Sequence, residues 1–268
     1  MATSRAARII AVANQKGGVG KTSTAVNLAT ALAERGYQVL LVDLDPQGNA
    51  STAVGVNSED RTLGMYQVLT GECGLRDAVV ATPVPRLMLL PATQDLAAAE
   101  VELSALPERE FCLRSILNAS DMAGFDPLFD LVLIDCPPAL GLLTINALAA
   151  ADSLLVPLQA EFLALEGLSY LLRTIEQVTR SLNPGLAVEG VLLTMVDRRN
   201  NLSSAVGDDV RRYLGDLVFS TEIPRNVKIS EAPSHGLPVL LYDRRCAGSL
   251  AYIALAEELE QRLARLAG

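Results

Sequence analysis

Two of the three lysines in this 268-residue chain lie five positions apart in one glycine-rich segment, Lys16-Gly17-Gly18-Val19-Gly20-Lys21-Thr22. The third is Lys228, and arginine supplies the other positively charged side chains. A lysine ammonium is a compact charge that suits a phosphate oxygen, whereas the planar fork of arginine prefers bidentate partners. The segment follows an apolar run at 8–13 and precedes a helical pattern at 21–35. A strand, a glycine-rich loop and a helix N-terminus in this order predict a site for nucleotide phosphates.

The segment departs from the usual phosphate-loop pattern, G-x-x-x-x-G-K-[ST], at one position. Gln15 stands where that pattern has its first glycine, and Lys16 is an additional cation. By the usual mechanics of such loops, the Lys21 ammonium reaches the β- and γ-phosphates, and the Thr22 hydroxyl binds Mg²⁺. A flexible turn is the alternative for any glycine-rich stretch. It does not explain why Lys-Thr completes this one between a strand and a helix.

Aspartates follow two apolar runs elsewhere in the chain. Asp135 ends the run Leu131-Val-Leu-Ile134, and Asp43 ends Val39-Leu-Leu-Val42, with Asp45 two positions later. A phosphate-loop enzyme needs a carboxylate at the end of a neighbouring strand to hold the water shell of its metal ion. Such an aspartate can also simply cap the next helix. Two such strands in one chain favour a catalytic site over two chance caps.

Short apolar runs alternate with helical patterns along the whole chain, and several of these runs are continuously apolar. Strands buried on both faces of a mostly parallel sheet have this character. We therefore predict an α/β fold, a doubly wound, mostly parallel sheet flanked by helices, in a single domain over residues 1–268 with residues 1–7 flexible. The expected strands are 8–13, 38–43, 87–90, 130–135, 153–158, 188–196, 218–223 and 238–242. The expected helices are 21–35, 95–119, 141–150, 165–182, 203–214 and 247–266.

The net charge of −9 is unevenly distributed along the chain. Residues 1–172 carry 10 Lys/Arg against 19 Asp/Glu, whereas residues 173–245 carry 10 against 9. Net charge governs solubility and long-range steering, while a local patch decides binding. On charge alone, a solvated surface of mixed sign is the simpler explanation of the arginines in the third quarter.

The cysteines and the apolar segments indicate where the protein resides. The four cysteines form no CxxC pair, which indicates reduced thiols in a cytosolic protein and neither a disulfide framework nor a metal site. The N-terminus lacks the apolar region of a signal peptide, and no apolar stretch reaches the length of a membrane span. We expect a cytoplasmic protein without a membrane partner.

The combination of these segments resembles the deviant Walker-A ATPases of the ParA/MinD group. The resemblance starts from the loop 16–23, from Val42-Asp-Leu-Asp-Pro-Gln-Gly-Asn49 and from Asp135-Cys-Pro-Pro138. It narrows to the Soj-type partitioning proteins through five later segments: Val156-Pro-Leu-Gln-Ala-Glu161, Leu165-Glu-Gly167, Thr194-Met-Val-Asp197, Ile223-Pro-Arg-Asn-Val227 and Ser230-Glu-Ala-Pro-Ser-His-Gly236. It runs from about Arg8 to the final helix, and the order of the motifs makes it specific.

The resemblance implies roles for individual residues of the nucleotide site. Lys16 is the signature lysine that reaches the partner subunit's nucleotide, Lys21 serves its own phosphates, and Asp45 positions the attacking water. Asp43 and Asp135 act with Thr22 around Mg²⁺, and ATP is the nucleotide. The family's nucleotide-binding positions fall on Lys16, Gly17, Gly18, Val19, Gly20, Lys21, Thr22, Ser23, Pro224 and Asn226. Residues 224–226 also suit a simple turn, and His235 is assigned a structural role.

The resemblance also implies partners. These are a second copy of the chain in the ATP state, double-stranded DNA bound without sequence preference over the nucleoid, and a ParB-like centromere-binding protein that stimulates hydrolysis. The expected DNA contacts are Arg199, Arg225 and Lys228, with Arg198, Arg211 and Arg212 as neighbours. Taken one at a time, each is nearly as well explained as an ordinary surface residue. The cargo is a chromosome or a plasmid, and the lack of room for a helix-turn-helix before the first strand favours the chromosomal style.

Two alternatives remain at this point. A MinD-like ATPase that cycles on a membrane during division-site positioning requires a C-terminal amphipathic helix with a basic polar face. Residues 249–268 carry three glutamates and two arginines, which is typical of a helix packed on the core. A metal-cluster or metallochaperone ATPase requires paired cysteines, which the sequence lacks.

Overall fold

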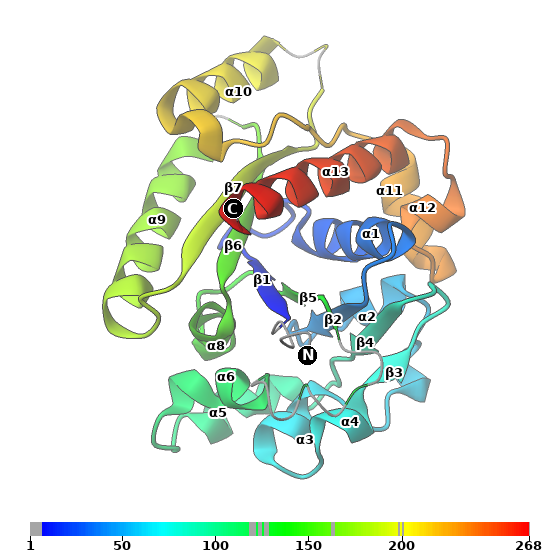
Figure 1. Ribbon diagram of the computed structural model, residues 1–268, viewed down its shortest axis with the longest axis vertical. Helices are drawn as coiled ribbons and strands as arrows, with labels where there is room; N and C mark the ends of the chain where they lie inside the picture. The colour runs from blue at the N-terminus through cyan, green and yellow to red at the C-terminus, as the bar shows by residue number, and fades with distance from the viewer. Residues whose placement is uncertain are drawn as a thin grey trace.

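The computed structural model describes residues 7–117, 122, 125, 129–161, 164–197, 199 and 201–267 (Figure 1). Residues 1–6 and Arg198, on which two of the sequence predictions fall, lie outside the described residues. Among the described residues, no helix is long and apolar enough to cross a membrane.

A seven-stranded sheet forms the centre of the molecule, in the order β3-β4-β2-β5-β1-β6-β7. All neighbours pair in parallel except β3, which runs antiparallel to β4 at one edge. The central strands β1, β2 and β5 consist almost wholly of branched apolar residues and are buried on both faces, as the sequence predicts. The strands are β1 (Arg8–Val12), β2 (Val39–Asp43), β3 (Val80–Ala81), β4 (Leu87–Leu90), β5 (Leu131–Asp135), β6 (Ser153–Gln159) and β7 (Ala187–Thr194).

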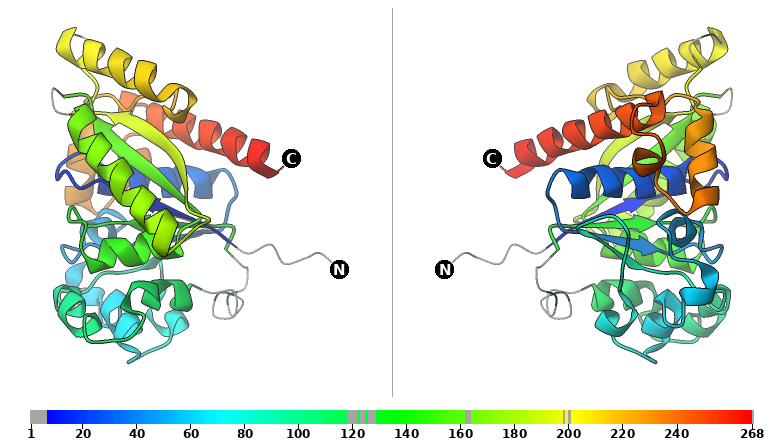
Figure 2. Two further views of the ribbon diagram at one scale, coloured as in Figure 1. Left: turned by 90° about the vertical axis from the view of Figure 1, so that its left-hand side faces the viewer. Right: turned by 90° about the vertical axis from the view of Figure 1, so that its right-hand side faces the viewer.

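Helices cover both faces of this sheet, which confirms the predicted doubly wound α/β architecture. On one face, α1 and α13 lie side by side over the strands, as both Figure 1 and Figure 2 show. The other face is covered chiefly by α3, α5, α6, α8 and α9. The helices are α1 (Lys21–Glu34), α2 (Asn49–Ala53), α3 (Met65–Thr70), α4 (Leu75–Ala78), α5 (Leu96–Leu103), α6 (Cys112–Ile116), α8 (Leu142–Ala150), α9 (Ala164–Ser181), α10 (Asn201–Leu214), α11 (Val227–Glu231), α12 (Val239–Tyr242) and α13 (Ala247–Ala267).

Three expected elements differ in the structure. The run 238–242 was expected as a strand, but it forms α12, because Pro238 fixes its own φ at the helix start and Val239 N–H donates to Asn27 Oδ1 on α1. The run 218–223 forms no regular strand but follows β7 irregularly, through an isolated bridge at Val218 and hydrogen bonds from Phe219 N–H and Ile223 N–H to β7 carbonyls. The helix expected over 95–119 breaks after α5, where Pro107 interrupts the chain and Glu108 adopts a positive φ.

The register of the central strands places the candidate site. Asp43 at the end of β2 pairs with Asp135 at the end of β5, and Asp135 in turn pairs with Val12 at the end of β1. The loop from β1 to α1 therefore begins beside the two aspartates, at the carboxyl ends of adjacent parallel strands. Ligands of open α/β sheets bind at this edge.

Candidate active site

The glycine-rich loop is held in place by contacts with the strand ends around it. The Asn14 side chain donates to Pro157 O at 2.8 Å and accepts from Lys16 N–H, which anchors the start of the loop to β6. The Thr194 hydroxyl donates to Val19 O at 2.8 Å, which ties the loop to the end of β7. Gly18 and Gly20 have positive φ angles of 73° and 85°, conformations that favour glycine. The loop thus ends directly at the N-terminus of α1, where unpaired N–H groups favour an anion.

The two lysines of the loop differ in burial and in their hydrogen-bond partners. Lys21 is buried, and its ammonium donates to Lys16 O at 3.1 Å, so it lies across its own loop. Burial lowers the pKa of Lys21, against the opposing charge of Asp135. The Lys16 side chain is about half exposed and forms an ion pair with Glu161 Oε2 at 2.6 Å. Lys21 therefore lies across its own loop, whereas the Lys16 side chain extends from the loop to Glu161.

Asp43 and Asp135 form a buried carboxylate pair at the strand ends. The Asp43 carboxylate accepts hydrogen bonds from Ser51 N–H at 2.8 Å and from the Ser51 hydroxyl at 2.6 Å. Burial raises the pKa of Asp43 to about 6 in spite of these bonds. Burial together with the charge of Asp43 raises the pKa of Asp135 well above its ordinary value, although the neighbouring Thr22 hydroxyl opposes this shift. Neither Asp135 oxygen has a partner at hydrogen-bond distance among the described residues.

An unpartnered buried carboxylate costs free energy, which a cation and its water shell would offset. Asp135 thus fits a magnesium site together with the Thr22 hydroxyl at the start of α1. Asp43, the third residue that the sequence predicts around the metal, pairs with Asp135 in the strand register and already accepts hydrogen bonds from Ser51. Among the described residues, no three His, Cys, Asp or Glu side chains form a protein-only metal cage. Mg²⁺ suits such a site because it is commonly bound through one or two protein oxygens, substrate phosphates and water.

Asp45 lies on a tight turn between β2 and α2. Its carboxylate accepts from Gln47 N–H at 3.0 Å, and its carbonyl accepts from Gly48 N–H at 2.9 Å. Gly48 has a positive φ of 64°, and the chain continues directly into α2. The buried Asp45 is therefore held at the edge of the same site, two residues beyond the Asp43 carboxylate.

Pro224 and Asn226 line a cavity of about 290 Å³ together with Gly20, Ser23 and Met195. The structure therefore brings Pro224 and Asn226, two of the expected nucleotide-binding residues, beside the phosphate loop. Asn226 also caps α11, because its side chain accepts from Lys228 N–H at 2.9 Å. Residues 224–226 therefore also have the structural role that the sequence indicates as the alternative to nucleotide binding. Met195 has a positive φ of 53°, which is uncommon for a residue with a side chain and is found more often at functional sites.

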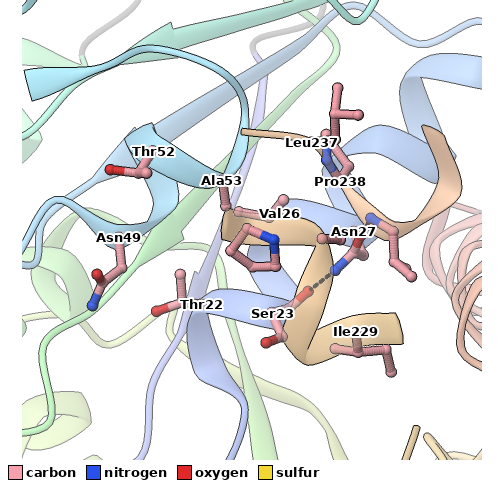
Figure 3. Close-up of a pocket in the computed structure, with 13 residues that line it drawn as sticks. Thr22, Ser23, Val26, Asn27, Asn49, Thr52, Ala53, Ile229, Leu237 and Pro238 are labelled. Carbon is pink, nitrogen blue, oxygen red and sulfur yellow. Dashed lines mark hydrogen bonds between the residues drawn. The ribbon is translucent and has the colours of Figure 1, made fainter. Parts of the chain in front are cut away.

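A second cavity of about 230 Å³ opens on the other side of Thr22 and Ser23. Thr22, Asn49 and Thr52 lie at one side of it and Ile229, Leu237 and Pro238 at the other, as Figure 3 shows. Residues of α1 and α2 both line this cavity, so α2, which follows the turn of Asp45, lies beside the N-terminus of α1. His235 lies nearby in the chain and stacks on the ring of Tyr242 with a centroid distance of 4.9 Å.

The expected DNA-binding residues come from two adjacent segments. Arg225 N–H donates to Val196 O at 3.1 Å, which brings the loop of Arg225 beside the end of β7. The Arg199 side chain is 90% exposed. Its Nε and Nη2 atoms donate to the two carboxylate oxygens of Asp197, each at 3.0 Å. Lys228 pairs with Glu231 at 2.8 Å. Arg211 differs from its neighbour Arg212 because it holds Phe219 O and Glu222 and is half-buried.

Sequence reasoning missed several residues of this site. Ser51 has no motif around it, and only the fold reveals that it holds Asp43. Glu161 belonged to a quoted motif, yet no pattern in the sequence pairs it with Lys16. The positive φ angle of Met195 could not be predicted, because no feature of the sequence indicates it.

Comparison with known proteins decides the family. A family model described as "AAA domain" matches residues 7–188. The chain is 55% identical over 255 residues to the chromosome partitioning protein ParA of Caulobacter vibrioides, which covers 95% of this chain and 94% of that protein. It is 50% identical to the sporulation initiation inhibitor protein Soj of Bacillus subtilis, with 94% and 98% covered. The chain belongs to the ParA/Soj family of chromosome-partitioning ATPases.

A solved structure supports the same conclusion for the fold and the cofactors. A Mycobacterium smegmatis protein described as cobyrinic acid a,c-diamide synthase superposes with a TM-score of 0.82 at 39% identity, with 96% of both chains covered. It contains an ATP analogue and magnesium. ATP and Mg²⁺ are accordingly the cofactors of a ParA/Soj ATPase such as this one, and the single-domain, doubly wound fold is confirmed.

Proposed function

We propose that this ParA/Soj ATPase is an ATP-dependent dimerising switch that partitions DNA. Two subunits sandwich two ATP molecules, the dimer binds double-stranded DNA without sequence preference, and a ParB-like partner stimulates hydrolysis. Hydrolysis dissolves the dimer and releases DNA, which moves a chromosome or a plasmid over the nucleoid. A cycle of this kind needs a ligand that favours one state, and an interfacial ATP has that property.

The observation that carries the proposal is the opposite setting of the two loop lysines. Lys21 is buried and lies across its own loop, so it serves the phosphates of its own subunit. The Lys16 side chain extends from the loop, and within the described part of the chain its ammonium pairs with Glu161 alone, an exposed interaction worth about 0–1 kcal/mol. An incoming triphosphate on a partner subunit competes with one carboxylate for this ammonium. Lys16 then stabilises the charge that develops on the transferred phosphoryl group.

In the hydrolytic step, a water oxygen attacks the γ-phosphorus, and the bond to the β,γ-bridging oxygen breaks to give ADP and phosphate. Asp45 orients this water, because its carboxylate lies at the edge of the site on a hydrogen-bonded turn. Mg²⁺ neutralises phosphate charge when it is bound. Thr22, Asp43 and Asp135 would act around the ion and its water shell, and Asp43 also keeps Ser51 and α2 in place beside them.

DNA binding is proposed for the surface formed by Arg199, Arg225 and Lys228. These side chains lie on adjacent segments at the end of β7, and phosphate contacts of this type need no sequence readout. A dimer presents the surface twice, so individually weak contacts bind usefully only in the ATP state.

The MinD-like alternative is less well supported. The apolar face of α13 is already used, since Tyr252, Leu255 and Leu259 are buried in the core against α1. Near its end, the Arg262 guanidinium lies 4.0 Å above the Phe219 ring and bonds Val218 O. This helix therefore presents no unpartnered apolar stripe with a basic face to a membrane.

Co-sedimentation tests the proposal. The full chain is mixed with duplex DNA or with vesicles of anionic phospholipid, each with Mg-ATP, Mg-ADP or no nucleotide. We expect pelleting with DNA in Mg-ATP and release in Mg-ADP, with no pelleting on vesicles. Pelleting on vesicles in Mg-ATP would support the MinD-like alternative, and DNA binding that ignores the nucleotide would contradict the switch.

A further inference from the structure

Arg61 makes an unusual set of contacts beneath the turn that carries Asp45. It comes from the loop after the 3₁₀ turn Ser58–Asp60, in a stretch whose sequence suggests an ordinary solvated arginine. Its guanidinium is instead partly buried and donates to Val56 O at 2.8 Å and 3.1 Å and to Ala92 O at 3.4 Å. One guanidinium thus joins the end of α2 to the segment that follows β4.

A chain of three hydrogen bonds leads from Arg61 to Asp45. Arg61 Nη2 donates to the Thr52 hydroxyl at 2.6 Å, and this hydroxyl donates to Gly48 O at 3.1 Å. Gly48 N–H donates to Asp45 O at 2.9 Å, which closes the turn. The guanidinium also occupies the space over Gly48, because a β-carbon built on that residue would overlap Arg61 Nη1. Arg61 therefore supports the turn both by hydrogen bonds and by contact.

The same segment reaches the metal side of the site. Ala92 N–H donates to the Ser51 hydroxyl at 3.2 Å, and that hydroxyl donates to Asp43 Oδ2 at 2.6 Å. Arg61 donates to the carbonyl of Ala92. Ser51 and Arg61 therefore bond the N–H and the C=O group of the same residue. The helix α2 is fixed between Asp43 on one side and Arg61 on the other.

We propose that Arg61 is a positioning residue for hydrolysis, which acts by holding the Gly48 turn so that Asp45 lies in reach of the attacking water. This inference rests on the proposed role of Asp45 and extends it to a residue that touches neither nucleotide nor metal. Because a displacement of about 1 Å at a reacting group can cost about 100-fold in rate, a support of this kind affects turnover strongly. Lysine does not replace it, since one ammonium does not span Thr52, Val56 and Ala92 as the planar fork does.

The test compares Arg61→Ala, Arg61→Lys and Thr52→Val in the full chain. We measure kcat with Mg-ATP in the presence of duplex DNA, the Kd of a fluorescent ATP analogue, and the thermal midpoint. All three variants are expected to lose about 10-fold or more in kcat while Kd changes by less than about threefold, the pattern for an interaction needed after binding. Thr52→Val breaks the hydrogen-bond chain but leaves Arg61 in place, so it separates the effect from loss of a large side chain.

Arg86→Ala is the matched control. Arg86 Nη1 donates to Gly36 O at 2.7 Å and lies against another glycine of positive φ, at the opposite end of β2. Its removal is expected to leave kcat within about twofold of the wild type. Methylguanidinium added to Arg61→Ala is expected to restore part of kcat, because it fits the space beside Gly48, and to leave Arg86→Ala unchanged.

Two outcomes overturn the inference separately from the proposed function. If Asp45→Ala abolishes turnover while Arg61→Ala and Thr52→Val keep wild-type kcat, Arg61 has no positioning role. If the Arg61 variants lose kcat and ATP binding in equal measure and methylguanidinium restores nothing, Arg61 only stabilises the fold. If Asp45→Ala itself turns over normally, the proposed hydrolytic role of Asp45 fails, and the inference fails with it.

Discussion

At the scale of single residues, burial decides what each charged group of this site does. Lys21 and Lys16 belong to one loop, yet one ammonium is buried across that loop and the other extends to Glu161. Asp43 accepts hydrogen bonds from Ser51 at Oδ2 and from Asp45 N–H at Oδ1, whereas neither oxygen of Asp135 has a partner at hydrogen-bond distance among the described residues. The site thus stores an unfavourable carboxylate in the absence of a cation, a common feature of functional sites.

The variant Asp135→Asn tests this imbalance. Its removal of a buried charge is expected to raise the free energy of unfolding by about 1 kcal/mol near pH 8 without nucleotide, and to abolish turnover. A carboxyl group whose folded pKa is raised binds more protons in the folded state, so its penalty grows as pH rises through that pKa. The gain should therefore shrink near pH 5.5. Urea unfolding at the two pH values checks this, and a variant less stable than wild type at pH 8 would contradict it.

The residues of the site were predictable to different degrees. Roles for Lys21 and Thr22 could be predicted from spacing, because a loop of neighbouring residues carries its own chemistry, whereas the role of Lys16 came from the family resemblance. Asp43 and Asp135 could be assigned because apolar strands end at them, and the register then places them side by side. The supports Ser51, Glu161 and Arg61 could not, because each meets its partner only through tertiary packing.

At the scale of elements, the sequence predicts the buried central strands best and the periphery worst. The apolar runs of β2 and β5 are continuous, which is typical of strands buried on both faces of a parallel sheet. The apolar residues of α12 instead pack against α1, where Pro238 and Asn27 start a helix. The segment 218–223 follows β7 without becoming a regular strand, and the Phe219 ring packs against Gly190 of β7.

Gly190→Ala tests this packing. A β-carbon on Gly190 would lie 2.6 Å from the Phe219 ring and 2.9 Å from Leu217 O, and the Arg262 guanidinium also lies over that ring, 4.0 Å from its centroid. We expect a loss of about 1–3 kcal/mol in the free energy of unfolding from this overpacking. Gly167→Ala on α9 is the control, since nothing lies within 4 Å of its β-carbon position and alanine favours a helix by about 0.5–1 kcal/mol. Equal stability of the two variants, measured by urea unfolding, would refute the packing argument.

At the scale of the whole molecule, the proposed nucleotide and DNA surfaces lie at the same end of the sheet. The loop of Arg225 contacts the end of β7, and the next residue, Asn226, lines the cavity beside the phosphate loop. The proposed nucleotide site therefore lies one residue from a proposed DNA contact, and we propose that this adjacency couples the two ligands.

Arg225→Ala and Arg199→Ala test the DNA surface. Each is expected to weaken binding of a duplex in Mg-ATP at every sequence tested and to reduce the slope of log K against log salt by about 1. Arg114→Ala, an exposed change of the same charge on α6 at the far side of the sheet, should alter neither. Fluorescence anisotropy over a salt series measures all three. Unchanged slopes for both arginine variants would place the DNA surface elsewhere.

The central claim is that Lys16 serves the nucleotide of the partner subunit while Asp45 serves its own. The ATPase rate of a mixture of Lys16→Ala and Asp45→Ala chains tests it most directly, because each variant alone is expected to be inactive while retaining ATP. In a mixed dimer, the Lys16→Ala subunit keeps its own Asp45 and receives Lys16 from its partner, so one intact site forms. An equimolar mixture is therefore expected to recover about a quarter of the wild-type rate, given random pairing and one working site per mixed dimer. A mixture as inactive as its two components would contradict the account.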